Sequence, residues 1–258
     1  MDRLTYPDIA RIFGTGLIAT GTGLLVFVLV TILWGDPFTR LTENSAQQDL
    51  KRQYATFTEN TSGPLTNDPT LDPELTRATA NRFRKRIPLG APVGTISIPS
   101  IHLNKRFVHG ARHPDLEKGP GLYKERGLPG SGGPIAIAGH RTTFGAPFLD
   151  VDKIKTGDKI VLTVPYGRFT YTVTRQQIIT PTDWSILDYG AEERTSAARA
   201  IVARTGRCIG SCEHLVLTAC HPKYSAAKRY AVYAKLTNVQ LRSVAPPTTP
   251  TATATAGA

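Results

Sequence analysis

The longest apolar run of the chain lies near its N-terminus and carries no charged side chain from Ile12 to Trp34. About 20 apolar residues are enough for a helix to cross the roughly 30 Å hydrocarbon core of a bilayer. A cleaved signal peptide is the alternative, but its apolar part is usually about 7–15 residues long and ends at a small-x-small cleavage site. This run is longer and ends at Trp-Gly-Asp-Pro. We therefore predict an uncleaved transmembrane helix over residues 12–34.

Charges beside this span predict its orientation. Arg11 directly precedes the span, whereas the first charge after it is Asp36. Lys and Arg close to a span favour the cytoplasmic side, and aromatic rings such as that of Trp34 settle at the interface. Residues 1–11 are therefore expected in the cytoplasm, and everything from Gly35 onward is expected outside it, on a single-pass anchor in the plasma membrane.

Residues 35–91 read as a linker or stalk with helical segments. Their first part is polar, with apolar residues at loosely helical spacing: Leu41, Leu50, Tyr54 and Phe57. That spacing fits either a stalk helix or a flexible linker. The turn-rich stretch 61–73 is expected to be irregular, and Pro73-Glu74 then opens a short helix with a basic, solvated face.

From Pro92 onward the pattern changes to short apolar or alternating runs that are typical of β-strands. The runs cover Val93–Ile98, Pro134–His140, Asp158–Val164, Arg168–Ile179, His214–Cys220 and Arg229–Leu236. The third and fourth predict a hairpin across Pro165-Tyr166-Gly167. Helical pattern is scarce between these runs, so βαβ units are disfavoured. We predict a mainly β domain, a largely antiparallel barrel, over residues 92–240.

Two segments do not follow this pattern of short strands. Residues 189–213 form a long stretch with some helical amphipathicity, which we interpret as an insertion on the barrel. Residues 241–258 are rich in Pro, Thr and Ala and hold nothing that could pack, so they are expected to be a disordered tail.

Composition adds a strongly basic balance and an odd number of cysteines. The formal net charge is +11, but the cations are spread along the chain and no nucleic-acid-binding motif is present. A basic domain beside anionic lipid and cell-wall polymer accounts for the charge more simply. The chain has 3 cysteines, and outside the cytoplasm an odd count leaves at least one free thiol beside any disulfide.

Cys220 is the cysteine best placed for chemistry. It ends an apolar run and is followed by His221-Pro222. Proline cannot continue a β-ladder, so the chain must leave the sheet there. A lone thiol is nevertheless a weak signal, because buried free cysteines are common small hydrophobes.

His140 and Arg229 strengthen the case for Cys220. His140 also stands at the end of an apolar run, and His is suited to give and take a proton in acyl transfer. Arg229 opens the last strong strand, where it shares a face with Ala231 and Tyr233. If that strand lies beside the Cys220 strand, a permanent cation reaches the thiol and can stabilise a thiolate and an oxyanion.

The text around these residues resembles sortases, and class E sortases of high-GC Gram-positive bacteria most closely. The matching segments are AIAGHRTTFGAPFLDVDKIKTGDKIVL, LVLTACHPKYSAAKRYAVYAKL and GLYKERGLPG. The resemblance implies a closed eight-stranded β-barrel with short helices, in which Cys220 is the nucleophile, His140 the general acid and base, and Arg229 the group that stabilises oxyanion and substrate. It also places Tyr123 among residues that contact substrate.

The resemblance further implies what the protein acts on. A sortase cuts a LAXTG- or LPXTG-like sorting signal of a secreted protein between Thr and Gly, holds the acyl group as a thioester, and passes it to a peptidoglycan amine. No cofactor and no metal are implied, and nucleic acid is not expected as a partner. One departure stands out: the family's TLXTC motif reads VLTAC here, with Val216 and Ala219 in place of threonines.

Other readings remain open on the sequence. L,D-transpeptidases carry a His-Gly-Cys element that is absent here, and papain-type peptidases place Cys before His. A degenerate, non-catalytic sortase-like scaffold is another alternative. A zinc site would use these ligands: Cys208, Cys212, His214 and His221. Against it we predict a disulfide between Cys208 and Cys212, which are close enough to pair if the loop between them turns.

Overall fold

The computed structural model describes residues 6–34, 37–58, 64–66, 73–185 and 213–242. Its helices are α1 (Tyr6–Trp34), α2 (Pro37–Thr58), α3 (Pro73–Arg86) and α4 (His113–Leu116), with 3₁₀ turns η1 (Pro99–Ile101) and η2 (Val151–Lys153). The strands are β1 (Leu65–Thr66), β2 (Pro92–Ile98), β3 (Leu103–His109), β4 (Gly121–Leu122), β5 (Ile135–Ala138), β6 (Lys159–Val164), β7 (Gly167–Ile179), β8 (His214–His221) and β9 (Lys228–Arg242).

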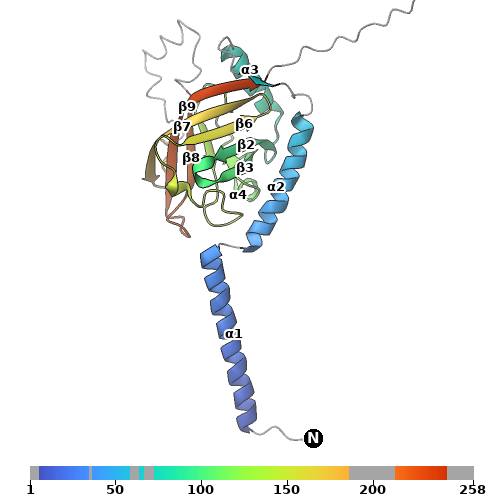
Figure 1. The fold of residues 1–258 in the computed structure, drawn as a ribbon, viewed down its shortest axis with the longest axis vertical. Coiled ribbons are helices and arrows are strands. Elements are labelled where there is room, and N and C mark those ends of the chain that lie inside the picture. Colours follow the sequence, from blue (N-terminus) through green and yellow to red (C-terminus); the bar gives the residue numbers. More distant parts are fainter. Residues whose placement is uncertain (1–5, 35–36, 59–63, 67–72, 186–212, 243–258) are drawn as a thin grey trace, which may run out of the picture.

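Strands β2 to β9 form a closed barrel (Figure 1). The sheet order is β1-β9-β7-β6-β2-β3-β4-β5-β8, and an additional β8–β9 pairing closes the ring. Most neighbours are antiparallel, while β3–β4 and β5–β8 run parallel. The closed eight-stranded barrel predicted above is therefore confirmed. The two-residue β1, which extends the sheet beside the end of β9, was not expected within the turn-rich stretch 61–73.

Alternating side chains divide each strand between the barrel interior and its outer face. In β8, Leu215, Leu217 and Ala219 point into the main core, whereas Val216 belongs to a second, outer cluster. The same division in β9 places Val232 in the core. The predicted β6–β7 hairpin is present and carries fully buried rings into the core: Phe169 and Tyr171. Closure of the barrel allows these alternating strands to bury their apolar side without leaving long open edges.

Helix α1 contains one candidate membrane span, Ala10–Val30, which has a mean hydropathy of 2.0 and is not buried against the rest of the protein. An apolar helix of this length whose candidate span is exposed is compatible with a single-pass anchor. In Figure 1 it extends away from the barrel as a separate rod.

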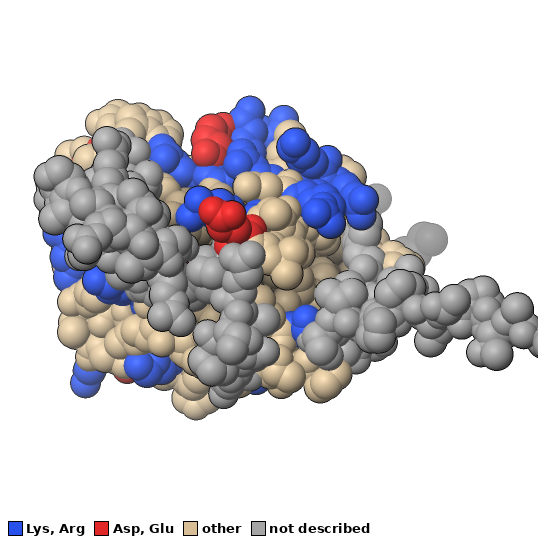
Figure 2. All heavy atoms as spheres, turned by 90° about the horizontal axis from the view of Figure 1, so that it is seen from above, with Lys and Arg blue, Asp and Glu red and all other residues tan. Residues whose placement is uncertain are grey.

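Helices α2 and α3 occupy the segment for which the sequence left a stalk or a linker open. α2 runs along the outside of the barrel, beside β2 and β3. α3 lies at the opposite end of the barrel from α1 (Figure 1) and ends in Arg84, Lys85 and Arg86. Lys and Arg outnumber acidic residues on the face seen from that end (Figure 2), so the basic face predicted for this helix is part of a wider basic surface.

Candidate active site

Cys220 and Arg229 are direct cross-strand partners in the β8–β9 ladder. Directly opposed residues of an antiparallel pair have Cβ atoms about 4.5–5.5 Å apart on the same face of the sheet. The face is the outer one, because Cys220 alternates with Ala219, whose side chain is in the core. The thiol is free and partly exposed. The strand pairing on which the sequence argument depended is therefore present.

His140 comes to the same end of the barrel on a third strand. β5 runs parallel to β8 with Ala138 opposite Thr218, and the Gly139 N–H donates to the Thr218 carbonyl at 3.0 Å. His140 follows two residues after Ala138, as Cys220 follows two after Thr218. The parallel register thus brings His140 level with Cys220, and the structure gathers all three predicted residues at one end of three neighbouring strands.

The His140 ring lies between two segments that flank it. Its centroid is 4.9 Å from that of Phe144 and 6.0 Å from that of His113 in α4. Nδ1 is 3.2 Å from the Thr143 hydroxyl, whereas the buried Nε2 has no hydrogen-bond partner among the described residues. Burial, reinforced by His113 and opposed by Glu117, holds the pKa of His140 below its usual 6.5. A neutral imidazole is thereby favoured near neutral pH.

Arg141 is buried and contacts the end of β8 at Cys220 and His221. Its side chain is 3% exposed. Nη1 donates to the Cys220 carbonyl at 3.3 Å and lies 2.8 Å from His221 Nδ1, while Nη2 pairs with Asp152 at 2.7 Å. Because a guanidinium can only donate, Nδ1 of His221 must accept, which leaves the ring proton on Nε2. Arg141 thus links the residue after His140 to the backbone of Cys220.

The guanidinium of Arg229 is held by the loop between β8 and β9. Its Nη1 donates to the carbonyls of Ala226 at 2.8 Å and Lys228 at 3.0 Å. That loop begins with a cis peptide bond before Pro222, where the sequence predicted that the chain leaves the sheet. The contacts use one nitrogen of the fork, so the others can face a substrate.

Tyr123 lies on the outer face of the same strands. Its hydroxyl is 3.3 Å from that of Thr218, two residues before Cys220. Its ring packs against a small outer cluster: Ala136, Ile179, Val216, Ala231 and Tyr233. Ala231 and Tyr233 thus share the outer face of β9, as the sequence predicted for them together with Arg229. These cluster residues are buried, and the partly exposed Tyr123 ring covers them on the side of the strands that carries Cys220.

This arrangement can be compared with known proteins. A sortase domain model matches residues 96–237, more than half of the chain. Sortase D of Bacillus subtilis is 30% identical over 188 residues, which cover 72% of this chain and 77% of that protein. The chain belongs to the sortase family. Members of this family are cysteine transpeptidases, so this sortase is an enzyme of that type.

Two further relatives extend the comparison. Sortase SrtE1 of Streptomyces coelicolor is 24% identical to this sortase over 246 residues, covering 92% of this chain and 60% of that protein. A solved sortase C of Clostridium perfringens, crystallised with the C-terminal cell wall sorting motif, is 18% identical with a TM-score of 0.50. That match covers 73% of this chain and 99% of the solved one, and at this identity it shows the shared fold alone.

The two departures from the sortase cysteine motif have different surroundings. Ala219 points into the barrel core at 3% exposure, so the missing threonine hydroxyl there would have faced the interior and not the substrate. Val216 lies in the outer cluster, four residues before Cys220. Val216 is 1% exposed and packs beneath Tyr123, on the face of the strand that also carries Cys220.

Several predictions concern residues outside the described part of this sortase. Cys208, Cys212 and most of the predicted insertion 189–213 lie there, so the disulfide stays a prediction. The two histidines of the zinc alternative are too far apart to share one ion. His214 and His221 stand at opposite ends of β8, roughly 20 Å apart at about 3.3 Å per residue. They cannot bind one ion together.

Three residues around the site were not assigned a role from the sequence: Arg141, His113 and Phe144. Arg141 had a local signal, since it directly follows His140 at the end of an apolar strand. Phe144 and His113 had none, because their relation to His140 depends on how two loops fold back on the barrel.

Proposed function

We propose that this sortase attaches secreted proteins to the cell wall by cutting a LAXTG- or LPXTG-like sorting signal between Thr and Gly. The observation that carries the proposal is the register that pairs Cys220 with Arg229 and brings His140 level with them. A thiol, a titratable imidazole and a permanent cation at one exposed strand end are the groups that acyl transfer requires.

Each group has a distinct part in the proposed reaction. The Cys220 thiolate attacks the threonine carbonyl carbon, and Arg229 stabilises the resulting oxyanion. The C–N bond to glycine then breaks as His140 delivers a proton to the departing amine, for which it must be in the protonated form that its lowered pKa makes the minor one near neutral pH. The threonine acyl group remains on Cys220 as a thioester. A peptidoglycan amine attacks this thioester, His140 takes up the proton of the amine, and the C–S bond breaks to release the thiolate.

Tyr123, which is partly exposed and packs on the buried outer cluster, is the residue proposed to contact the signal peptide near Cys220. Its hydroxyl lies 3.3 Å from that of Thr218, and the cluster beneath it is buried, so the cluster holds the Tyr123 ring in place. The class E resemblance favours alanine over proline at the second position of the signal. Orientation with the barrel outside the cytoplasm, where sorting signals and peptidoglycan amines are found, belongs to the same proposal.

The full chain in detergent, incubated with LAXTG and LPXTG peptides and a primary amine, tests this function. We expect a new product in which the amine is joined to threonine, identified by mass. A signal peptide carrying a thiol-reactive group should be trapped on Cys220, and Cys220→Ala should abolish both product and adduct. Transfer by Cys220→Ala, or an adduct on Cys208 or Cys212, would contradict the assignment. A wild-type chain that transfers nothing would favour the non-catalytic scaffold.

A further inference from the structure

One face of α2 is buried against the barrel although the helix is polar overall. Glu43, Gln47, Leu50 and Tyr54 recur at spacings of four, three and four residues, which places them on one side of an α-helix. Glu43 is 1% exposed, Leu50 2% and Tyr54 9%. The Tyr54 ring also lies 4.1 Å from the guanidinium carbon of Arg106 in β3. The segment that follows the membrane span is thus attached to the barrel wall by a defined set of side chains.

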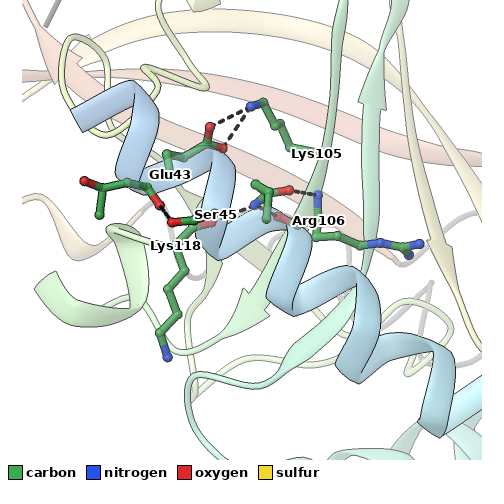
Figure 3. Close-up of polar contacts among 7 residues, drawn as sticks. Glu43, Ser45, Lys105, Arg106 and Lys118 are labelled. Carbon is green, nitrogen blue, oxygen red and sulfur yellow. Dashed lines mark hydrogen bonds and ion pairs between the residues drawn. The ribbon is translucent and has the colours of Figure 1, made fainter. Parts of the chain in front are cut away.

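Glu43 connects this helix to the loop that follows His140. Its two carboxylate oxygens accept from Lys105 Nζ at 2.9 and 2.8 Å (Figure 3). The same carboxylate lies directly over Gly145, whose φ is +69° and where an added Cβ would lie 2.5 Å from the Glu43 oxygen. Gly145 follows Phe144, the residue whose ring is packed on His140. Glu43 therefore contacts the loop of Phe144 and Gly145, one of the two segments beside His140.

Gln47, one turn further along, reaches the other segment. Its Nε2 donates to the carbonyls of Arg106 at 3.0 Å and Lys118 at 2.6 Å, and its Oε1 accepts from the Arg106 N–H at 2.8 Å (Figure 3). Gln47 Nε2 also lies so close to Gly119 that an added Cβ would collide with it. Lys118 and Gly119 close the turn that begins with His113 in α4, and the ring of His113 is the second neighbour of His140.

We propose that α2 is a positioning element of the active site, in which Glu43 and Gln47 hold the two segments between which the His140 ring lies. The proposal rests on the proposed function only for the part that His140 plays in the reaction. Loops are the mobile parts of a barrel, whereas a helix tethered at several points is rigid. A displacement of about 1 Å in a reacting group can cost up to about 100-fold in rate, so α2 need not touch the substrate to govern turnover.

The chain offers matched variants for the test. Glu43→Ala/Gln47→Ala removes both contacts, whereas Gln48→Ala and Asp49→Asn alter exposed residues of the same helix. Glu43→Gln keeps the shape over Gly145 and one bond to Lys105, so it serves as the conservative rescue. The full chain in detergent is used throughout, and circular dichroism on heating identifies a temperature at which each variant is folded.

The double variant should lower kcat for peptide transfer about tenfold or more, with KM within about twofold because Tyr123, the proposed peptide contact, is untouched. In the double variant, the His140 ring should be less buried between His113 and Phe144. Its pKa, followed in NMR spectra, should therefore rise toward the ordinary value, although Glu117 and His113 remain near. The pH profile of Cys220 alkylation, mapped by mass, should shift with it. The single variant Glu43→Gln, which keeps Gln47, should retain most of the wild-type rate. Both control variants, Gln48→Ala and Asp49→Asn, should behave as wild type.

A double variant that keeps the wild-type kcat and His140 titration, and only melts at a lower temperature, would overturn the proposal and leave α2 a purely structural support. If the wild type transfers no peptide, the proposed function fails. The His140 titration and the alkylation profile still decide whether α2 positions the ring.

Discussion

At the scale of single residues, two arginines hold the Cys220 turn from opposite sides. Arg229 lies on the outer face, where its Nη1 donates to the Ala226 carbonyl, whereas Arg141 is buried and donates to the Cys220 carbonyl. Their surroundings predict different consequences when each is replaced. Replacement of Arg229 should lower the reaction rate. Replacement of Arg141 should also lower the stability of the fold.

Replacement of Arg229 should act on the transition state. By analogy with the loss of one oxyanion-hole donor, Arg229→Ala is expected to lower kcat by about 10²–10³, or roughly 2.7–4 kcal/mol. Arg229→Lys keeps the charge but loses the planar fork, so we expect an intermediate loss. Single-turnover rates of thioester formation measure both. Lys228→Ala, an exposed neighbour, is the control, and an Arg229→Ala enzyme with wild-type turnover would exclude an oxyanion role.

Arg141→Met should weaken the fold because it removes charge-assisted hydrogen bonds to Asp152 and to the backbone of Cys220. Such bonds contribute about 1.5–3 kcal/mol when made by charged groups, and we expect a loss of that order in the free energy of unfolding by urea. Asp152 is partly exposed, so water can compensate for part of the loss. Lys153→Met breaks the exposed Lys153–Asp150 pair and should change stability by less than about 0.5 kcal/mol. Equal effects of the two substitutions would contradict this account.

At the scale of elements, the start of β8 is joined to a loop and to β7 through one buried carboxyl group. Glu213 is 1% exposed. It accepts from the N–H groups of Gly130 and Gly132 and from the Tyr171 hydroxyl. Burial, the largest effect, outweighs these bonds and raises the pKa of Glu213 from 4.5 to about 7. The group that joins these elements is therefore protonated at mildly acidic pH.

This shift predicts a pH-dependent stability. Between pH 4.5 and about 7 the folded state binds more protons at Glu213 than the unfolded state does, so the free energy of unfolding should fall as the pH rises. The expected loss is on the order of 3 kcal/mol. Urea titrations across this range compare the wild type with Glu213→Gln, in which this contribution should vanish. Glu125→Gln, at an exposed site, should retain the wild-type slope. A Glu213→Gln chain with an unchanged slope would show that other groups cause it.

At the scale of the whole molecule, an apolar helix, a docked helix and a barrel follow one another along the chain. α2 lies between the candidate span and the first barrel strand and contacts β2 and β3.

The proposed orientation predicts the outcome of proteolysis on intact protoplasts. Because Arg11 precedes the span and Asp36 follows it, the barrel should lie outside and be removed by added protease, leaving a fragment of about the size of α1. A cytoplasmic marker protein should stay intact in the same sample. A fully protected barrel would refute the orientation and, with it, access to secreted substrates.

Local pattern was sufficient to predict most of the barrel strands, although not the two-residue β4, and to place three residues at strand ends; the predicted span is compatible with the apolar helix α1. Period-two alternation, long uncharged runs and proline are local properties, and Cys220, His140 and Arg229 all stand where such a pattern begins or stops. The family resemblance added closure and the number of strands.

Tertiary structure alone decided what surrounds those residues. The pairing of Cys220 with Arg229 depends on strand register, and the burial of His140 depends on loops that pack only after the barrel closes. Glu43 and Gln47 look like ordinary solvated residues of a polar helix, because no local pattern shows that a helix face will meet two glycines from distant loops. Side chains whose role depends on contacts between segments far apart in the chain remain hidden until those segments are placed together.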